Sequence, residues 1–446
     1  MAFARASLKN LPSFRRGVHP PDAKAATCGR PIEPMPFVSE YVLPLGQSIG
    51  APSAPLVDPG DTVSRGQRIA APGGFVSVAL HAPVKGVVTA IEPRPRAGGQ
   101  IVPSIVLRAD PFSNQMPQLS EPLDLGSMDR DSVVSAVQNA GIVGLGGAAF
   151  PSHVKLAIPE EKRVRTVIVN GCECEPYLTC DHRIMVEHPK EVIRGTEILL
   201  KISGAEQAFI GVESNKPDAI EALTSVAPDN VRVVPTAVKY PQGGERMLIA
   251  AILGPEVGAG GLPLDVEVLV NNVGTAFALT NLFDKGQPLI DRVFTVTGPA
   301  IAEPKNLLVP IGTKISDIVE HCGGLLPSAK QVVLGGPMMG LSLSRLDVPL
   351  VKGASGLLCL DSVAPSSSEA FACIRCARCV SACPMGLNPS RLTRIAEAGK
   401  AEDLPDAHIG SCFECASCSF VCPSGIPLVQ WIRIGKTLVA ERREEE

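Results

Sequence analysis

The chain has 446 residues, more than one hydrophobic core supports, so we expect several domains. Its net charge of −4, with Lys and Arg scattered along the sequence, excludes a broad basic surface of the kind that binds nucleic acid. No apolar run approaches the roughly 18 residues of a membrane-spanning helix, and we expect no secretory signal.

Residues 1–110 begin with an irregular, Pro-rich stretch and continue as short β-type runs broken by Gly and Pro. Runs such as YVLPL, GVVTAIEP and IVPSIVL are typical of the strands of a small sandwich. The segment GDTVSRGQRIA resembles the hammerhead of biotin- or lipoyl-carrying domains, but the modifiable lysine in a tight hairpin is absent. We therefore predict a sandwich used for docking rather than as a carrier, followed by a linker at 111–127.

Helical and strand patterns alternate over residues 128–280. MDRDSVVSAVQNAG predicts a helix with Asp129 as its N-cap and Gly141 as its stop, and RTVIVNG predicts a buried strand. Such alternation indicates a parallel α/β sheet. Over residues 281–360 the pattern changes to that of a small α+β module.

Eight of the fourteen cysteines form two runs, CIRCARCVSACP and CFECASCSFVCP, in a region at 365–430 that we predict to be helical at its middle. Both runs match the Cys-x₂-Cys-x₂-Cys-x₃-Cys-Pro pattern of bacterial two-cluster ferredoxins, in which the fourth cysteine ligates the other cluster. On this logic, one [4Fe–4S] cluster is held by Cys373, Cys376, Cys379 and Cys422. The other is held by Cys412, Cys415, Cys418 and Cys383. A pair of zinc sites is the alternative, but zinc ribbons rarely place three ligands at consecutive x₂ gaps and end on Cys-Pro.

Two segments flank the cysteine region. The Ser-rich residues 364–368 are predicted to join it to the preceding module. The tail at 431–446 continues a stretch, IPLVQWIRIGKTLVAERR, that mixes apolar and basic residues. This stretch either lies on a membrane surface or packs as a helix on the cluster domain or on a partner subunit.

A glycine-rich loop, GIVGLGGAAFP at 141–151, resembles a dinucleotide fingerprint only at first sight. It follows a predicted helix rather than a strand, and its third fingerprint position is not Gly, so we do not predict a Rossmann site. The same region also holds Lys155 and the loops NGCECEP, KYPQGGE and VNNVGT. Glycines allow close approach to a phosphate and a lysine balances its charge, so this set predicts a site for an aromatic, phosphorylated cofactor.

This set of motifs resembles the FMN- and NADH-binding domain of the flavoprotein subunit of respiratory complex I. With the stretches FRRGVHPP, PLGQSIGAP and GGPMMG and the doubled cysteine motif, the whole chain resembles the RnfC family, whose members are subunits of the Rnf ion-translocating electron-transport complex. The resemblance implies a multidomain α/β fold. Its parts are a β barrel-sandwich N-terminal domain, a complex-I-flavoprotein-like α/β domain, a small β-grasp-like (SLBB) module and a helical two-cluster ferredoxin-like domain.

The resemblance also implies roles for individual residues around FMN and NADH. The residues implied at the phosphate region are Gly144, Gly146, Gly147 and Lys155. Those implied to line the flavin or NADH are Asn170, Glu173 and Glu175, opposite a wall of Tyr240, Gly243 and Glu245. Asn271, Asn272 and Thr275 are implied at the end nearer the phosphate. Phe150, expected to stack near the nicotinamide, and Glu175 are the catalytic candidates.

The sequence departs from the complex I pattern at three positions. Cys172 replaces an aspartate, Leu145 stands in place of a basic residue, and Gly244 replaces one of a pair of glutamates. These changes leave FMN as the expected flavin and bear mainly on the affinity for NADH. Cys172, Cys174 and Cys180 are close in sequence, and we interpret them as small loop residues that line the cofactor pocket rather than as ligands.

The implied function is electron transfer between NADH, FMN and two [4Fe–4S] clusters in a peripheral subunit at the cytoplasmic face of the inner membrane. The implied partners are the integral membrane and iron–sulfur or flavin subunits of an ion-translocating ferredoxin:NAD⁺ oxidoreductase, with ferredoxin indirectly and no nucleic acid. One alternative is a soluble corrinoid reductase, in which the sandwich-like segment is expected after the clusters rather than before them. Another is a flavin-free iron–sulfur adapter, against which the complete Lys155, NGCECEP and NNVGT set argues.

Overall fold

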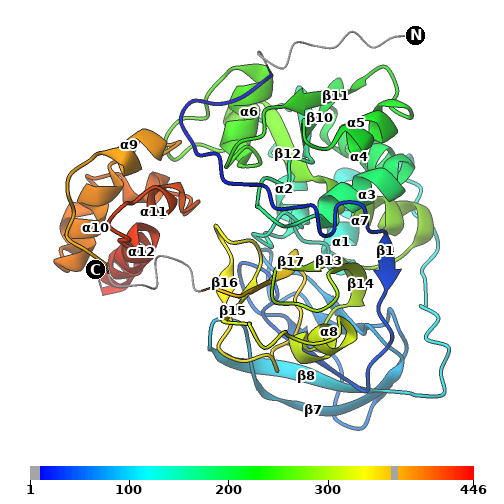
Figure 1. Ribbon diagram of the computed structural model, residues 1–446. Coiled ribbons are helices and arrows are strands. Elements are labelled where there is room, and N and C mark those ends of the chain that lie inside the picture. The colour runs from blue at the N-terminus through cyan, green and yellow to red at the C-terminus, as the bar shows by residue number, and fades with distance from the viewer. Residues whose placement is uncertain (1–10, 363–369, 446) are drawn as a thin grey trace.

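The computed structural model describes residues 11–362 and 370–445 and divides them into four units (Figure 1). The four units match the expected multidomain α/β architecture. The predicted Ser-rich connection at 364–368 lies outside the described residues.

The first unit is a small sandwich of two antiparallel sheets. One sheet has the order β2-β8-β7-β4 and the other the order β3-β5-β6. The strands are β2 (Glu40–Pro44), β3 (Ala54–Pro55), β4 (Thr62–Val63), β5 (Arg68–Ala71), β6 (Leu80–His81), β7 (Gly86–Pro95) and β8 (Ile101–Ala109). Tyr41, Leu43, Ile69, Leu80 and Leu107 are fully buried between the sheets and form the core of the sandwich.

The second unit is a parallel sheet of order β11-β10-β9-β12, covered by helices on both faces. Its strands are β9 (Thr166–Asn170), β10 (Gln207–Glu213), β11 (Val231–Thr236) and β12 (Val268–Asn272). Its helices are α1 (Arg130–Asn139), α2 (Ser152–Leu156), α3 (Cys180–Glu187), α4 (Pro189–Ser203), α5 (Pro217–Thr224), α6 (Glu245–Leu253) and α7 (Val273–Lys285).

Side chains of β9 alternate between the two faces of this sheet, as the pleat requires. Val167 and Val169 join the core beneath α4 and α7, whereas Ile168 joins the core beneath α6. The expected helix before the glycine loop is confirmed as α1, and the Asp129 carboxylate caps it by accepting from the Ser132 amide at 2.8 Å.

The third unit is a mixed sheet of order β1-β14-β13-β17-β15-β16, with one helix, α8 (Ile315–His321). The strands are β1 (Ile32–Pro34), β13 (Asp291–Thr297), β14 (Lys305–Pro310), β15 (Gln331–Leu334), β16 (Leu341–Ser342) and β17 (Gly356–Leu360). Strand β1 comes from the N-terminal stretch that the sequence predicts to be irregular, and it pairs in parallel with β14. That pairing joins segments more than 270 residues apart, so no local pattern indicates it.

The fourth unit is the helical cysteine region, which lies to one side of the other three (Figure 1). Its helices are α9 (Arg378–Ala382), α10 (Pro389–Glu397), α11 (Ser417–Phe420) and α12 (Leu428–Glu445). Leu428 and Ile432 of α12 are buried, Ile432 together with Leu392 of α10 in one apolar core, so this end of the helix packs on the cluster unit. In the described part of the chain, no helix is both long and apolar enough to cross a membrane.

The N-terminal arm, residues 11–30, runs across the α/β unit and reaches the cluster unit (Figure 1). The Gly17 amide donates to the Ala382 carbonyl at 3.1 Å, and Val18 forms an isolated antiparallel bridge with Tyr240. Further along the arm, the Lys24 ammonium donates to the Glu175 carbonyl at 2.9 Å. The arm thus connects the α/β unit to the cluster unit at the place where their surfaces meet.

Two buried basic groups lie where the sandwich meets the α/β unit. The Lys352 ammonium donates to the carbonyls of Ala79 and Gly141 at 2.8 and 2.7 Å. Burial lowers the pKa of Lys352 to about 7. Burial, with a further contribution from the Lys352 charge, lowers the pKa of His81 to about 3, and the His81 Nδ1 atom has no hydrogen-bond partner.

Acid should therefore weaken this junction. The folded-state pKa of His81 lies below its ordinary 6.5, so below about pH 6.5 His81 is protonated in the unfolded chain but stays neutral in the folded chain. The free energy of unfolding therefore falls as the pH falls below about 6.5. Between about pH 7 and pH 5 this costs about 2 kcal/mol. We expect His81→Leu to lose less stability than the wild type over that range in urea unfolding. His19→Leu, at an exposed histidine, is the control; an equal loss in all three proteins would contradict the assignment.

Candidate functional site

The carboxyl edge of the parallel sheet holds the predicted cofactor residues. Strands β9 and β12 are neighbours and end side by side at Asn170 and Asn272, which are paired in register. Ligands of open α/β sheets bind beyond the carboxyl ends of the strands, and here the glycine loop lies above that edge.

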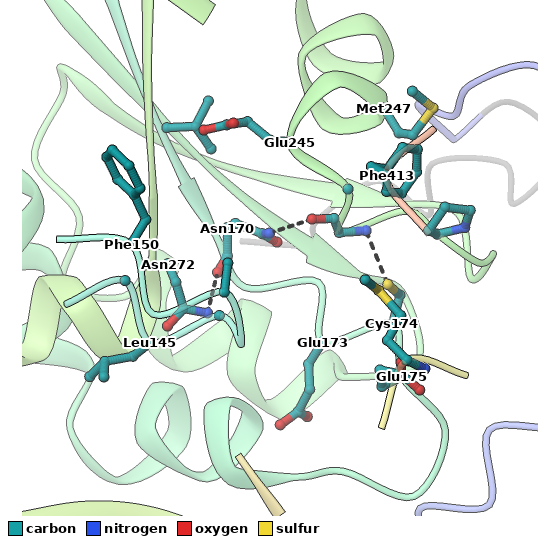
Figure 2. Close-up of a pocket in the computed structure, with 18 of the residues that line it drawn as sticks. Leu145, Phe150, Asn170, Glu173, Cys174, Glu175, Glu245, Met247, Asn272 and Phe413 are labelled. Atoms are coloured by element: carbon teal, nitrogen blue, oxygen red, sulfur yellow. Dashed lines mark hydrogen bonds between the residues drawn. The ribbon is translucent and has the colours of Figure 1, made fainter. Parts of the chain in front are cut away.

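A cavity of about 490 Å³ opens between the sheet edge, the glycine loop and the cluster unit (Figure 2). This volume lies in the usual range for a small-molecule or cofactor site. Of the predicted residues, the cavity is lined by Gly144, Gly146, Phe150, Lys155, Asn170, Glu173, Glu175, Tyr240, Gly243, Glu245, Asn271 and Asn272.

The glycine loop is held by its own backbone and by helix α7. The Gly144 amide donates to the Phe150 carbonyl at 2.8 Å, and the Leu145 amide donates to the Thr275 hydroxyl at 3.0 Å. The resemblance implies that Thr275 and Gly147 contact the cofactor, but neither lines the cavity. Thr275 instead positions the loop from behind.

Asn170 and Asn272 have defined hydrogen-bond partners at the cavity floor. The Asn170 side-chain amide donates to the Gly243 carbonyl at 2.7 Å (Figure 2). The Asn272 side-chain amide donates to the Asp181 carboxylate at 2.6 Å. The Asn272 side-chain oxygen also accepts from the Gly274 amide at 2.8 Å and so caps α7.

Four polar atoms of cavity-lining residues are buried and have no hydrogen-bond partner. They are the side-chain nitrogen of Asn271, the hydroxyls of Tyr240 and Ser152, and one carboxylate oxygen of Glu173, which lies 3.7 Å from the Lys24 ammonium. Buried polar groups are nearly always hydrogen-bonded in folded proteins, so unpartnered groups around one cavity indicate a ligand that supplies the partners. This is the chemistry expected around the edge and side chain of a flavin.

Lys155, on α2, reaches the cavity from the side of the glycine loop. Its ammonium lies 2.6 Å from the Glu245 carboxylate and donates to the Val270 carbonyl at 3.2 Å. Both partners of this ion pair are about one-third exposed, so the ion pair is weak. Lys155 can therefore exchange Glu245 for a ligand phosphate at a small cost in free energy.

Two carboxyl groups of the NGCECEP loop titrate near neutral pH. Burial raises the pKa of Glu173 to about 7, although the nearby Lys24 ammonium opposes the rise. Burial also raises the pKa of Glu175 to about 7, and the amides of Met338 and Met339, which donate to it at 3.1 and 2.8 Å, oppose the rise. Carboxyl groups poised in this way suit proton exchange at a reaction centre.

The structure explains why the GGPMMG motif has a glycine at position 336. A Cβ atom at Gly336 would lie 2.3 Å from a Glu175 carboxylate oxygen, so only glycine lets this loop approach the carboxylate. The loop then brings Met339 into the cavity wall, which sequence reasoning did not assign.

The cluster unit forms one wall of the cavity. Its residues 410–413 line the cavity, and Phe413 lies near Met247 and Cys174 at the end opposite Phe150 (Figure 2). A Cβ atom at Gly244 would be 3.7 Å from the Phe413 ring and 3.1 Å from the Pro241 carbonyl oxygen. The departure from the complex I glutamate at Gly244 therefore leaves room for Phe413. This contact between distant segments has no signal in the sequence.

The three cysteines of the α/β unit differ in position. Cys174 and Cys180 line the cavity as expected, whereas Cys172 is buried against the Gly211 carbonyl and Thr236 and does not reach it. Asp181, which the sequence did not indicate, also lines the cavity. Its carboxylate accepts the hydrogen bond from the Asn272 side chain.

The cysteines of the two runs occupy two places. A small pocket of about 20 Å³ is lined by Cys383 together with Cys412, Cys415 and Cys418, and Cys412 also faces the large cavity. At the other place, the Phe371 amide donates to the Ser424 carbonyl at 2.9 Å, which brings the start of the first run next to the end of the second. Cys373 and Cys376 are exposed there.

Within the described ranges, no three His, Cys, Asp or Glu side chains converge closely enough to share a single metal ion.

Family comparisons match all four units. The matches are the Nuo51 FMN-binding domain at residues 137–281, the RnfC barrel sandwich hybrid domain at 12–111, the SLBB domain at 293–342 and the 4Fe-4S dicluster domain at 369–426. Among solved structures, a chain of an NAD⁺-reducing [NiFe]-hydrogenase in the H₂-reduced state is 21% identical, with a TM-score of 0.48. That alignment covers 71% of this chain and 63% of the hydrogenase chain.

Curated relatives cover most of the chain. A subunit of the proton-translocating ferredoxin:NAD(+) oxidoreductase complex of Clostridium ljungdahlii is 44% identical over 87% of this chain and 85% of its own length. The corresponding subunit of the Na(+)-translocating ferredoxin:NAD(+) oxidoreductase complex of Acetobacterium woodii is 43% identical over 97% of this chain and 98% of its own. That of the ion-translocating oxidoreductase complex of Rhodobacter capsulatus is 42% identical over 97% and 84%. The chain therefore belongs to the RnfC family, the members of which are subunits of ion-translocating ferredoxin:NAD⁺ oxidoreductase complexes.

Proposed function

We propose that this chain is the peripheral subunit through which an Rnf-type complex exchanges electrons with NAD(H), by way of FMN and two [4Fe–4S] clusters. The observation that carries the proposal is the shared cavity wall. Cys412 and Phe413 of the dicluster domain face the same cavity as Asn170 and Glu175 of the FMN-binding domain.

FMN would convert the two-electron chemistry of NADH into the one-electron chemistry of the iron–sulfur clusters. A flavin can do this because it accepts a hydride as two electrons and releases them singly to iron–sulfur centres. The residues of the chain hold and orient this chemistry. The glycine loop and Lys155 are suited to the phosphate, and Asn170 and Asn271 to the polar edge and side chain of the flavin. Glu173 and Glu175 are suited to hold or release a proton near pH 7.

The ligand sets that we propose for the clusters are crossed. Cys383 with Cys412, Cys415 and Cys418 forms the inner set, named for its place beside the flavin cavity. The outer set consists of Cys373, Cys376, Cys379 and Cys422. Because two members of the outer set are exposed, this set is the natural outlet toward a partner.

The remaining parts of the proposal concern the assembly. The relatives are named as subunits of ion-translocating complexes, and in the described residues no helix is suited to cross a membrane. We therefore propose that other subunits carry the coupling ion, and that this chain attaches to them at the cytoplasmic face of the inner membrane. Ferredoxin would exchange electrons with it only through those subunits.

The cofactor content of anaerobically prepared full-length protein tests the proposal. We expect about eight iron atoms per chain, as two [4Fe–4S] clusters require, together with one FMN. The flavin should be identified by chromatography after release from the protein. Protein that has a full complement of iron but binds no flavin would be an iron–sulfur adapter, and the proposal would fail.

A further inference from the structure

Arg292 is a buried arginine that directly contacts the glycine loop. It lies on β13 of the third unit, and its side chain is only 2% exposed. Its Nε atom donates to the Ala354 carbonyl at 2.9 Å, and Nη2 donates to the Leu145 carbonyl at 2.6 Å. The guanidinium thus joins the third unit to the loop that forms one wall of the flavin cavity.

In the described part of the chain, the guanidinium of Arg292 forms no direct ion pair with a carboxylate, and its hydrogen-bond partners are the two backbone carbonyls. The neighbouring Asp291 is paired with Arg65 at 2.7 Å, and Asp181, whose pKa Arg292 lowers against the effect of burial, accepts a hydrogen bond from Asn272 instead. Arginine keeps its charge in proteins, and a buried charge without a partner is costly, so a missing anion is expected nearby.

The surroundings of Arg292 fit a bound anion. A Cβ atom at Gly274 would lie 3.2 Å from Arg292 Nη1, so the guanidinium lies beside the first turn of α7. This 13-residue helix, whose Gly274 amide is capped by Asn272, directs the positive end of its dipole toward the same place. The buried, unpartnered side-chain nitrogen of Asn271 lines the adjoining cavity.

The contact between Arg292 and Leu145 bears on a departure of this sequence from the complex I pattern. Position 145 is where the complex I pattern has a basic residue and this chain does not. The guanidinium of Arg292 contacts the carbonyl of that same residue from behind the loop. A charge that is missing from the loop is therefore present beneath it, supplied by another unit of the fold.

We propose that Arg292 is the residue that selects a phosphorylated flavin: its charge and its hold on the Leu145 carbonyl favour FMN over riboflavin. The inference rests on the proposed function. Arg292 does not line the cavity, so it acts as a positioning residue, by orienting the loop and by its field at the phosphate. Binding of FMN would bring the charge of its phosphate toward the buried guanidinium, which forms no direct ion pair.

The test compares FMN with riboflavin on full-length protein from which the flavin has been removed, by the quenching of flavin fluorescence. Arg292→Met removes the charge and keeps a long, unbranched apolar side chain, and Arg292→Lys keeps the charge but loses the planar fork. We expect Arg292→Met to weaken FMN binding by roughly 10- to 100-fold and riboflavin binding by less than about threefold. Arg292→Lys should lose a smaller part of the preference for FMN.

Arg183→Met is the matched control, because Arg183 is also a buried arginine but its side chain donates to Glu187 and to the Cys28 carbonyl rather than to the glycine loop. It should leave the ratio of the two affinities unchanged. Equal losses of FMN and riboflavin in Arg292→Met, or no loss of either, would overturn the inference. If Arg292→Met does not fold, Arg292→Lys decides: an unchanged ratio overturns the inference. A wild-type protein that binds neither flavin would instead overturn the proposed function.

Discussion

Replacement of Cys383 by alanine should disconnect the flavin from both clusters, although Cys383 belongs to the first cysteine run. The crossed assignment places Cys383 in the inner set, beside the flavin cavity. Loss of the inner cluster should reduce the iron content to about four atoms per chain. NADH should then still bleach the flavin, but the outer cluster should no longer be reduced by NADH.

Cys422→Ala should give the complementary result. This cysteine ends the second run, yet the crossed assignment makes it a ligand of the outer cluster. The iron content should again fall by half, but the inner cluster should remain reducible by NADH. Cys322→Ala, at a buried cysteine outside both runs, is the control and should keep all the iron.

Electron paramagnetic resonance of the one cluster that remains in each variant distinguishes Cys383→Ala from Cys422→Ala. If each run held its own cluster, Cys383→Ala would spare the cluster nearest the flavin and Cys422→Ala would destroy it. That reversed pattern would rule out crossed ligation.

Gly195→Ala should strongly destabilise the α/β unit. Gly195 lies on α4 where this helix crosses α7, and a Cβ atom there would be 2.0 Å from the Ala276 backbone oxygen. Because the obstacle is backbone rather than a flexible side chain, the two helices must move apart. Overpacking of this kind costs about 1–3 kcal/mol or more, even after the better helix propensity of alanine is counted.

Urea unfolding of the flavin-free protein measures this effect. Gly258→Ala is the matched control, since an added Cβ atom at that exposed glycine meets no atom within 4 Å. FMN binding should also weaken in Gly195→Ala, because α7 carries Asn272 at its N-terminus. Equal stability of the two variants would contradict the close packing of α4 on α7.

Local patterns were enough to predict much of this molecule. The α1 helix and its Asp129 cap follow from a short sequence signature, and they are confirmed. The alternation of strands and helices correctly indicated the parallel sheet, whose carboxyl edge brings Asn170 and Asn272 together. In each case the signal and the structure involve residues close in sequence or related by a regular period.

What the sequence did not predict depends on contacts between distant segments. Strand β1 pairs with β14, Lys24 of the N-terminal arm lies beneath Glu175, and Phe413 closes the flavin cavity. Arg292 reaches the glycine loop from a different unit. Such contacts depend on how the units pack on one another, and neither periodicity nor spacing carries that information.

We infer that NADH, the flavin cavity and the cysteine clusters form one electron path within this chain. Anaerobic mixing of NADH with protein loaded with FMN and iron–sulfur clusters reveals this path when the visible absorbance of the flavin and of the clusters is followed together. We expect NADH to bleach both in FMN-loaded protein, and the cluster signal not to respond when FMN is left out. Clusters that stay oxidised while the flavin is bleached, or that are reduced by NADH without FMN, would contradict it.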